Sequence, residues 1–186
     1  MTTLKKINLL AICLLLTFAA LAQDVQDSQD KKNHLSSQKG ETTIGVGLGL
    51  PYGAIGLRLG TNITDGLNLF GGVGYQISGV GYNIGLLKDF PSSGMTQFYL
   101  TGMYGTNAAI KVNGLPEYDK VYTGPSFGIG IKINSMDGNY LDLGLLLPIR
   151  SSEYYDDETA VKNDPRISEF QAAWTVLIVI GYNFNL

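Results

Sequence analysis

Apolar and polar residues alternate along this chain from Thr42 to Leu186. In the stretch Tyr140–Arg150, every odd position is leucine or isoleucine, whereas the even positions include Asp142 and Arg150. Successive side chains of a strand point to opposite faces, so a period of two predicts β-strands whose two faces differ. No segment after residue 22 has a helical period or an apolar run of 18 residues, so we expect no transmembrane helix there.

Turn signals divide the alternating region into eight expected strands. Six of the connections carry the signals "PYG", "TNITDG", "ISG", "PSSG", "NGLPEYD" and "NSMDGN", and the seventh is the long segment from Ser151 to Gln171. The strands are expected at about 42–50, 54–62, 67–76, 80–90, 96–112, 121–133, 140–150 and 172–186. Ten strands are the alternative if the segment from Ser151 to Gln171 contains a hairpin. The pattern predicts an all-β chain of antiparallel strands.

The residue composition of the two strand faces indicates which face lies inside the barrel. One face is apolar, while the other is mostly glycine with a few charged residues. A soluble sandwich would cover its outer face with Lys, Glu, Thr and Ser, since glycine is a poor strand former and leaves strand edges unprotected. The interior of an eight-stranded barrel has little space, which suits glycine. We therefore predict a single transmembrane up-and-down β-barrel with its apolar face toward lipid and Phe70 and Tyr99 inside.

The height of the apolar face agrees with a membrane barrel. From Leu141 to Ile149 there are eight steps of about 3.4 Å, or roughly 27 Å along the strand. A tilt of about 40° projects this to about 21 Å, near the apolar band of about 25 Å of outer-membrane barrels. With the first strand starting in the periplasm, the long loops "NGLPEYDK" and Ser151–Gln171 lie outside.

The N-terminal segment predicts export. Lys5 and Lys6 precede an apolar run that ends at Ala20-Leu21-Ala22, the pattern of a signal peptide over residues 1–22. An N-terminal anchor helix is the alternative. Residues 23–41 are polar without periodicity, which predicts a disordered leader before the barrel of residues 42–186. The single cysteine, Cys13, lies within the expected signal, so no disulfide is expected.

Composition narrows the function classes. The formal charge of −3 offers no basic stripe for nucleic acid, so no nucleic-acid partner is expected. The only histidine is His34, in the expected leader. Histidine is the usual base of enzymes, and none stands in the expected barrel, so we predict that the protein is not an enzyme and needs no cofactor.

The C-terminal "IVIGYNFNL", with Ile180, Tyr182 and Phe184 alternating, resembles the signal read by barrel-insertion machinery, although the last residue is Leu186 rather than an aromatic. Over Thr42–Leu186 the architecture resembles the small eight-stranded barrels of the outer membrane protein A and X kind, especially their glycine-rich Bacteroidetes-type versions. The resemblance implies an integral protein of a Gram-negative cell outer membrane. Its partners would be outer-membrane lipid and, through the last strand, the insertion machinery.

Four charged residues are predicted to point inward as a polar network: Arg58, Lys132, Asp142 and Arg150. Lys132 and Asp142 lie nearly opposite each other across "NSMDGN", so we expect them to pair. Buried charges need partners, and the network is expected to plug the barrel. A selectivity constriction or a proton path is the alternative.

The segment after Arg150 is expected to be a mobile external loop. Five of its residues are candidate contacts for an unknown extracellular ligand: Glu153, Tyr154, Tyr155, Asp156 and Asp157. The acids lack the D-x-D-x-D-G spacing of calcium loops, so no metal site is expected, with calcium as the alternative. The predicted function is a structural or surface-interaction role through the external loops. A narrow porin-like conduit, or a binder of small apolar molecules, is the alternative.

Overall fold

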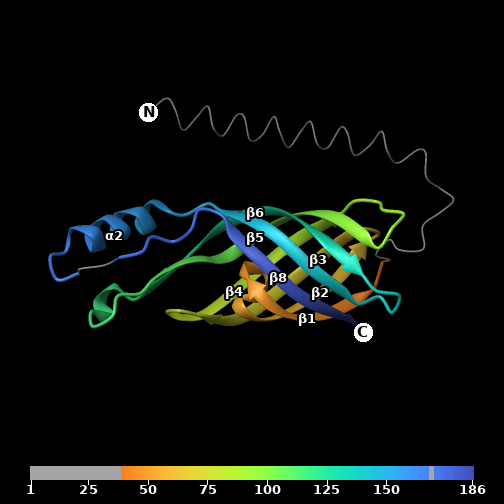
Figure 1. Cartoon of the computed structure of the whole chain (residues 1–186), viewed down its shortest axis with the longest axis horizontal. Helices are drawn as coiled ribbons and strands as arrows, with labels where there is room; N and C mark the ends of the chain where they lie inside the picture. Colours follow the sequence, from red (N-terminus) through yellow and green to blue (C-terminus); the bar gives the residue numbers. More distant parts are fainter. Residues whose placement is uncertain (1–38, 168–169) are drawn as a thin grey trace, which may run out of the picture. The chain divides into compact units, whose positions relative to one another are not determined.

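The computed structural model describes residues 39–167 and 170–186, so the predicted signal peptide and most of the predicted leader lie outside the described residues. Eight antiparallel strands close into one barrel, because β1 pairs with β8 and every other strand pairs with its neighbours in sequence (Figure 1). The prediction of an all-β, eight-stranded barrel is confirmed, and the alternative of ten strands is wrong for the described residues. The strands are β1 Thr42–Gly49, β2 Ala54–Thr64, β3 Leu67–Gln76, β4 Gly79–Asp89, β5 Thr96–Ile110, β6 Lys120–Asn134, β7 Tyr140–Pro148 and β8 Leu177–Asn185.

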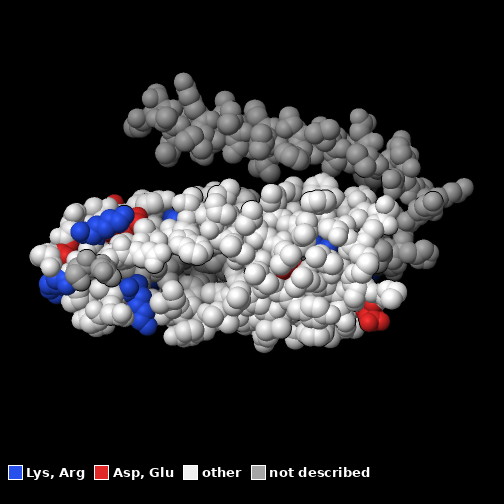
Figure 2. Space-filling model, in the orientation of Figure 1, with Lys and Arg blue, Asp and Glu red and all other residues white. Residues whose placement is uncertain are grey.

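The strand registers place apolar residues together on the outer wall. Ile44 of β1 lies opposite Leu59 of β2, and Ile129 of β6 lies opposite Leu145 of β7. These side chains are solvent-accessible; Ile129, for example, is 58% exposed. On the face shown in Figure 2, charged side chains gather at the end that carries α2, and the wall of the barrel has few. The outer surface of the barrel wall is therefore apolar.

The interior holds the residues that a soluble protein would place on its surface. Arg58, Lys132 and Asp142 are all buried. An apolar cluster fills the remaining space with aromatic and aliphatic side chains: Leu50, Tyr52, Phe70, Leu87, Tyr99, Met103, Leu146 and Val179. The predicted inward direction of Phe70 and Tyr99 is thus correct.

The connection between β1 and β2 turns into the barrel. It forms a short 3-10 helix, η2 (Leu50–Tyr52), whose three residues are all buried. The sequence predicted an ordinary turn here. The inward path requires glycine on the facing strands, because a Cβ added at Gly74 would overlap the carbonyl of Tyr52 and one at Gly72 would overlap that of Pro51. Gly53 closes the turn in the left-handed region at φ 67°.

One end of the barrel carries a second folded layer. The β5–β6 hairpin, with 15 residues in each strand, packs against α2 (Ser152–Asn163), and η3 (Pro116–Tyr118) lies in the hairpin connection. Their shared core is Ala108, Ile110, Tyr122, Tyr154 and Val161. Among the described residues, no helix is both long enough and apolar enough to cross a membrane.

The helix α2 corrects the expectation of an irregular loop after Arg150. Its buried residues Tyr154, Glu158 and Val161 are spaced i, i+4, i+7, which is one face of a helix. The charged Glu158 in the middle concealed this period from a hydrophobicity pattern. The side chain of Ser151 accepts a hydrogen bond from the Tyr154 amide and caps the first turn.

Candidate functional site

Asp142 is the centre of the polar network inside the barrel. It lies on β7 and is 0% exposed. Its Oδ2 accepts hydrogen bonds from the guanidinium of Arg58 at 2.8 Å and from the hydroxyl of Tyr52 at 3.1 Å. Its Oδ1 accepts from the hydroxyl of Tyr99 at 2.6 Å. Both carboxylate oxygens are thus satisfied by protein groups, as a buried charge requires.

Arg58 of β2 is the positive partner of this carboxylate. Its second terminal nitrogen donates to the hydroxyl of Tyr140 at 2.7 Å and to the amide oxygen of Asn183 at 2.9 Å. The guanidinium also lies 5.0 Å from the ring centre of Tyr52 and 5.6 Å from that of Phe70, within the range of cation–π contacts. Strands β2, β7 and β8 and the inward turn are therefore joined at one point.

Lys132 makes a second buried ion pair, with a partner that the sequence did not predict. Its ammonium lies 2.8 Å from Oδ2 of Asp89, and both side chains are almost fully buried. Lys132 and Asp142 are indeed neighbours in register across β6 and β7. The expected pairing between them is nevertheless wrong, because Asp142 is engaged by Arg58, while the Lys132 side chain extends to β4.

Arg150 is the exception among the four predicted interior charges. It follows the end of β7 and lies at the end of the barrel that carries α2. There its guanidinium donates a hydrogen bond to the carbonyl of Trp174 and lies 5.1 Å from the ring centre of Tyr154. Its assignment to the interior was wrong because β7 stops at Pro148, so the alternation no longer sets its direction. Arg150 instead links the start of α2 to the segment that returns to β8.

The five predicted loop contacts divide into two kinds. Tyr154 is buried edge-to-face against Tyr122, with ring centres 5.3 Å apart, so it stabilises the second layer. Glu153 and Asp157 both accept hydrogen bonds from the ammonium of Lys120, at 2.7 and 2.9 Å. The hydrogen bond from Lys120 lowers the pKa of Asp157, and a further bond from Tyr122 acts in the same direction.

Tyr155 and Asp156 remain on the exposed side of α2. Glu153 is exposed as well, but its carboxylate is engaged by Lys120. Beyond the helix, the guanidinium of Arg166 pairs with Asp164 and Glu117, and this contact with Arg166 holds the pKa of Asp164 below its ordinary value. The charged groups of this end thus tie α2 and its return segment to the β5–β6 hairpin.

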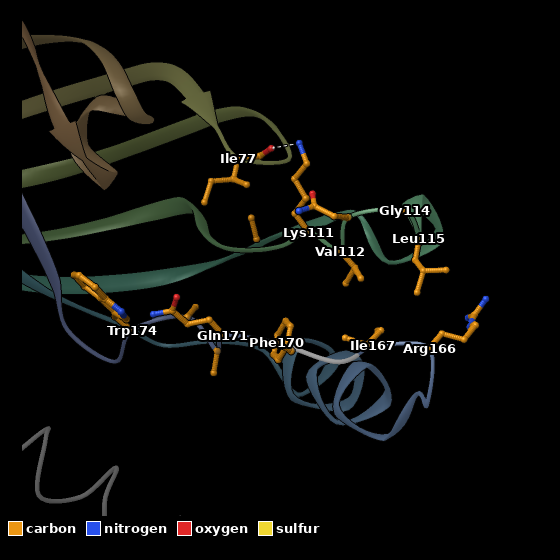
Figure 3. A pocket seen from close by; sticks show the side chains of 14 residues that line it. Ile77, Lys111, Val112, Gly114, Leu115, Arg166, Ile167, Phe170, Gln171 and Trp174 are labelled. Atoms are coloured by element: carbon orange, nitrogen blue, oxygen red, sulfur yellow. Dashed lines mark hydrogen bonds between the residues drawn. The ribbon is translucent and has the colours of Figure 1, made fainter.

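A cleft at the same end was not predicted from the sequence. It has a volume of about 850 Å³ and lies between the β3–β4 turn, the β5–β6 connection and the return segment before β8 (Figure 3). We call it the mouth cleft, and the residues that matter for its chemistry are Lys111, Val112, Leu115, Ile167, Phe170 and Trp174. Its walls come from three separate connections, so no single stretch of sequence signals it.

The described residues contain no group of three or more His, Cys, Asp or Glu side chains that could hold a metal ion. The interior carboxylates are instead occupied by Arg58, Lys132 and tyrosine hydroxyls. Inside the barrel, the charges of Arg58 and Lys132 are each neutralised by a buried carboxylate. The residues with free surface for a ligand lie at the α2 end.

Comparisons with known proteins give one structural resemblance. No family model and no curated protein sequence matches the chain. Among solved structures, the N-terminal β-barrel domain of Pseudomonas aeruginosa OprF is similar with a TM-score of 0.47 and 16% identity, over 78% of this chain and 98% of that domain.

Proposed function

We propose that this protein is an integral β-barrel of the bacterial outer membrane with a structural or surface-interaction role. The observation that carries this proposal is the inverted distribution of polarity. Apolar side chains such as Leu57, Ile84 and Ile180 are exposed on the outer wall, whereas Arg58 and Asp142 are buried inside. An apolar wall around a whole barrel far exceeds the patches that soluble monomers expose, and it suits a hydrocarbon solvent.

The closed sheet supports the same proposal. In a bilayer every backbone hydrogen-bonding group must be satisfied within the protein, which a closed barrel achieves because it has no strand edges. Here β1 and β8 pair from Thr43–Asn185 to Leu48–Ile180 and complete the ladder. Outer-membrane lipid would then surround the wall. The insertion machinery would read β8, whose Ile180, Tyr182 and Phe184 point outward.

The folded layer at the α2 end supports a role at the cell surface. Outer-membrane barrels have short periplasmic turns and longer extracellular loops. The β5–β6 hairpin and α2 form the larger end here, and α2 presents Tyr155 and Asp156 to solvent. An extracellular partner would meet these residues first. The other end has the compact turns between β2 and β3 and between β6 and β7.

The filled interior favours this role over a conduit. The inward turn places Tyr52 across the interior, where it bonds Asp142 and Asn183. Phe70, Tyr99 and Met103 occupy more of the same space. Eight strands enclose only enough room for side chains. A continuous water path would therefore require the turn to leave the barrel.

Cell fractionation and gel mobility test the proposal. We expect the protein in the outer-membrane fraction, and we expect unboiled samples in detergent to migrate differently from boiled ones, because the closed backbone ladder resists detergent. Leu57→Asp and Ile84→Asp should block assembly, since a charge on the lipid face is costly. Asp156→Lys on the exposed side of α2 is the matched control and should assemble normally. Recovery of the native protein in the soluble periplasmic fraction would refute the proposal.

A further inference from the structure

The mouth cleft has a positive group, Lys111, that makes no ion pair among the described residues, although the Asp119 carboxylate accepts a hydrogen bond from the neighbouring Val112 amide. The ammonium of Lys111 donates to the carbonyl of Ile77 at 3.1 Å. Figure 3 shows this contact at the side of the cleft next to Ile77. By contrast, Arg166 at the other side is neutralised by Asp164 and Glu117. The free charge of the cleft is thus concentrated at Lys111.

Apolar side chains make up about half of the cleft lining, beside the polar side chains of Asn113 and Gln171. Val112, Leu115, Ile167 and Phe170 face the space between the β5–β6 connection and the return segment (Figure 3). Val112, Ile167 and Phe170 are only partly buried against the second core, so each leaves apolar surface uncovered. Burial of that surface by a ligand would be favourable in proportion to the area removed from water.

Trp174 connects the cleft to the outer wall of the barrel. It is 61% exposed and lies three residues before β8, whose Ile178 and Ile180 are exposed on the wall. Tryptophan at the edge of an apolar wall is typical of the interface between membrane and water. Trp174 thus belongs both to the cleft lining and to the segment that leads into the outer wall.

We propose that the mouth cleft binds a single-chain amphiphile of the fatty-acid class. Its carboxylate pairs with Lys111, and its alkyl chain lies on Val112, Phe170 and Trp174. The cleft volume of about 850 Å³ is within the range of small-molecule sites. That this ligand comes from the membrane rests on the function proposed above. The binding itself does not depend on that function.

The sole tryptophan of the chain, Trp174, allows a direct test. The full barrel, refolded into nanodiscs of a zwitterionic phospholipid, is titrated with a fatty acid brominated in mid-chain, which quenches tryptophan on contact. We expect saturable quenching by the acid. Its methyl ester, at equal loading of the bilayer, should quench only weakly and without saturation, because it cannot pair with Lys111. Equal quenching by both would mean contact through the bilayer alone and would overturn the proposal.

Variants separate the site from the membrane. Lys111→Gln should weaken binding of the acid at least about tenfold, as expected for loss of one charge-assisted hydrogen bond. Leu115→Glu should weaken it by placing a negative charge in the apolar part. Lys88→Gln, an exposed lysine of β4 near the other end, is the matched control and should bind as the wild type does. Gel mobility of each variant shows whether it folds.

Unchanged binding in folded Lys111→Gln would overturn the proposal. Failure of fatty-acid binding leaves the outer-membrane assignment intact, because fractionation and gel mobility test that separately. Conversely, binding by a barrel that does not fractionate with the outer membrane would support the cleft and refute the proposed location. The two proposals therefore fail in different experiments.

Discussion

Removal of the carboxylate at position 142 should be among the most damaging single changes in the barrel. Asp142→Leu deletes the acceptor of three hydrogen bonds and leaves Arg58, which is 2% exposed, without its counter-charge. Loss of one member of a buried pair costs about 3–5 kcal/mol. Arg58 keeps its bonds to Tyr140 and Asn183 and its contacts with aromatic rings, so we expect about 3 kcal/mol, the lower end of that range.

A double-mutant cycle tests the reasoning. Arg58→Met combined with Asp142→Leu should cost less than Asp142→Leu alone, because no uncompensated charge remains. The assay is equilibrium unfolding of the refolded barrel in urea with lipid vesicles, followed by tryptophan fluorescence. A second cycle with Lys132→Met and Asp142→Leu is the control. Its coupling energy should be smaller than that of the Arg58 cycle, since the direct partner of Lys132 is Asp89. Additivity of the Arg58 cycle, or stronger coupling in the Lys132 cycle, would refute the arrangement.

Three further predictions concern the inward turn and the α2 end. Gly181→Ala should destabilise the barrel by about 1–3 kcal/mol, because the new Cβ meets the ring of Tyr52, whereas Gly102→Ala, where a Cβ has ordinary contacts only, should change the unfolding midpoint little. The wild-type barrel should give no stable conductance steps in planar bilayers; steady steps with Tyr52 intact would favour the conduit. Asp157 and Asp164 have lowered pKa values, so their stabilisation of the α2 end is complete above the ordinary value of 3.8 and is lost as the pH falls through the lowered values. The protection factors of the α2 amides, which correct for the intrinsic pH dependence of hydrogen exchange, should therefore fall in acid below that value. Asp157→Asn should reduce this pH dependence, and protection factors independent of pH would contradict the reasoning.

The strands and their faces could be predicted from the sequence because they follow a local rule. Alternation alone determines that Ile129 faces outward and Asp142 inward, and pairing of sequence neighbours gives the order of strands. The same rule predicts that Lys132 and Asp142 are cross-strand neighbours in the β6–β7 hairpin. Each ion-pair partner, however, depends on which strands face each other across the interior, and the local pattern does not contain that information.

The inward turn and the mouth cleft were missed for a related reason. "PYG" has the composition of an ordinary turn, and its inward path depends on glycines of other strands, such as Gly72 and Gly74. The helix α2 could have been found from signals at its ends, since Ser151 caps it and Lys162 stands in its last turn. The cleft joins three distant connections, which only the folded chain brings together.

The long reach of the contacts around Tyr52 has a consequence for assembly. Tyr52 bonds Asp142, 90 residues away, and Asn183, 131 residues away. Neither contact can form until the last two strands have arrived, and the turn must already lie between the strands when β1 meets β8. Contacts so distant in sequence form late and slowly in folding. We therefore expect the interior to become ordered in the same step in which β1 pairs with β8. A chain lacking β8 would then form an open sheet without the interior contacts of Tyr52, rather than a smaller barrel.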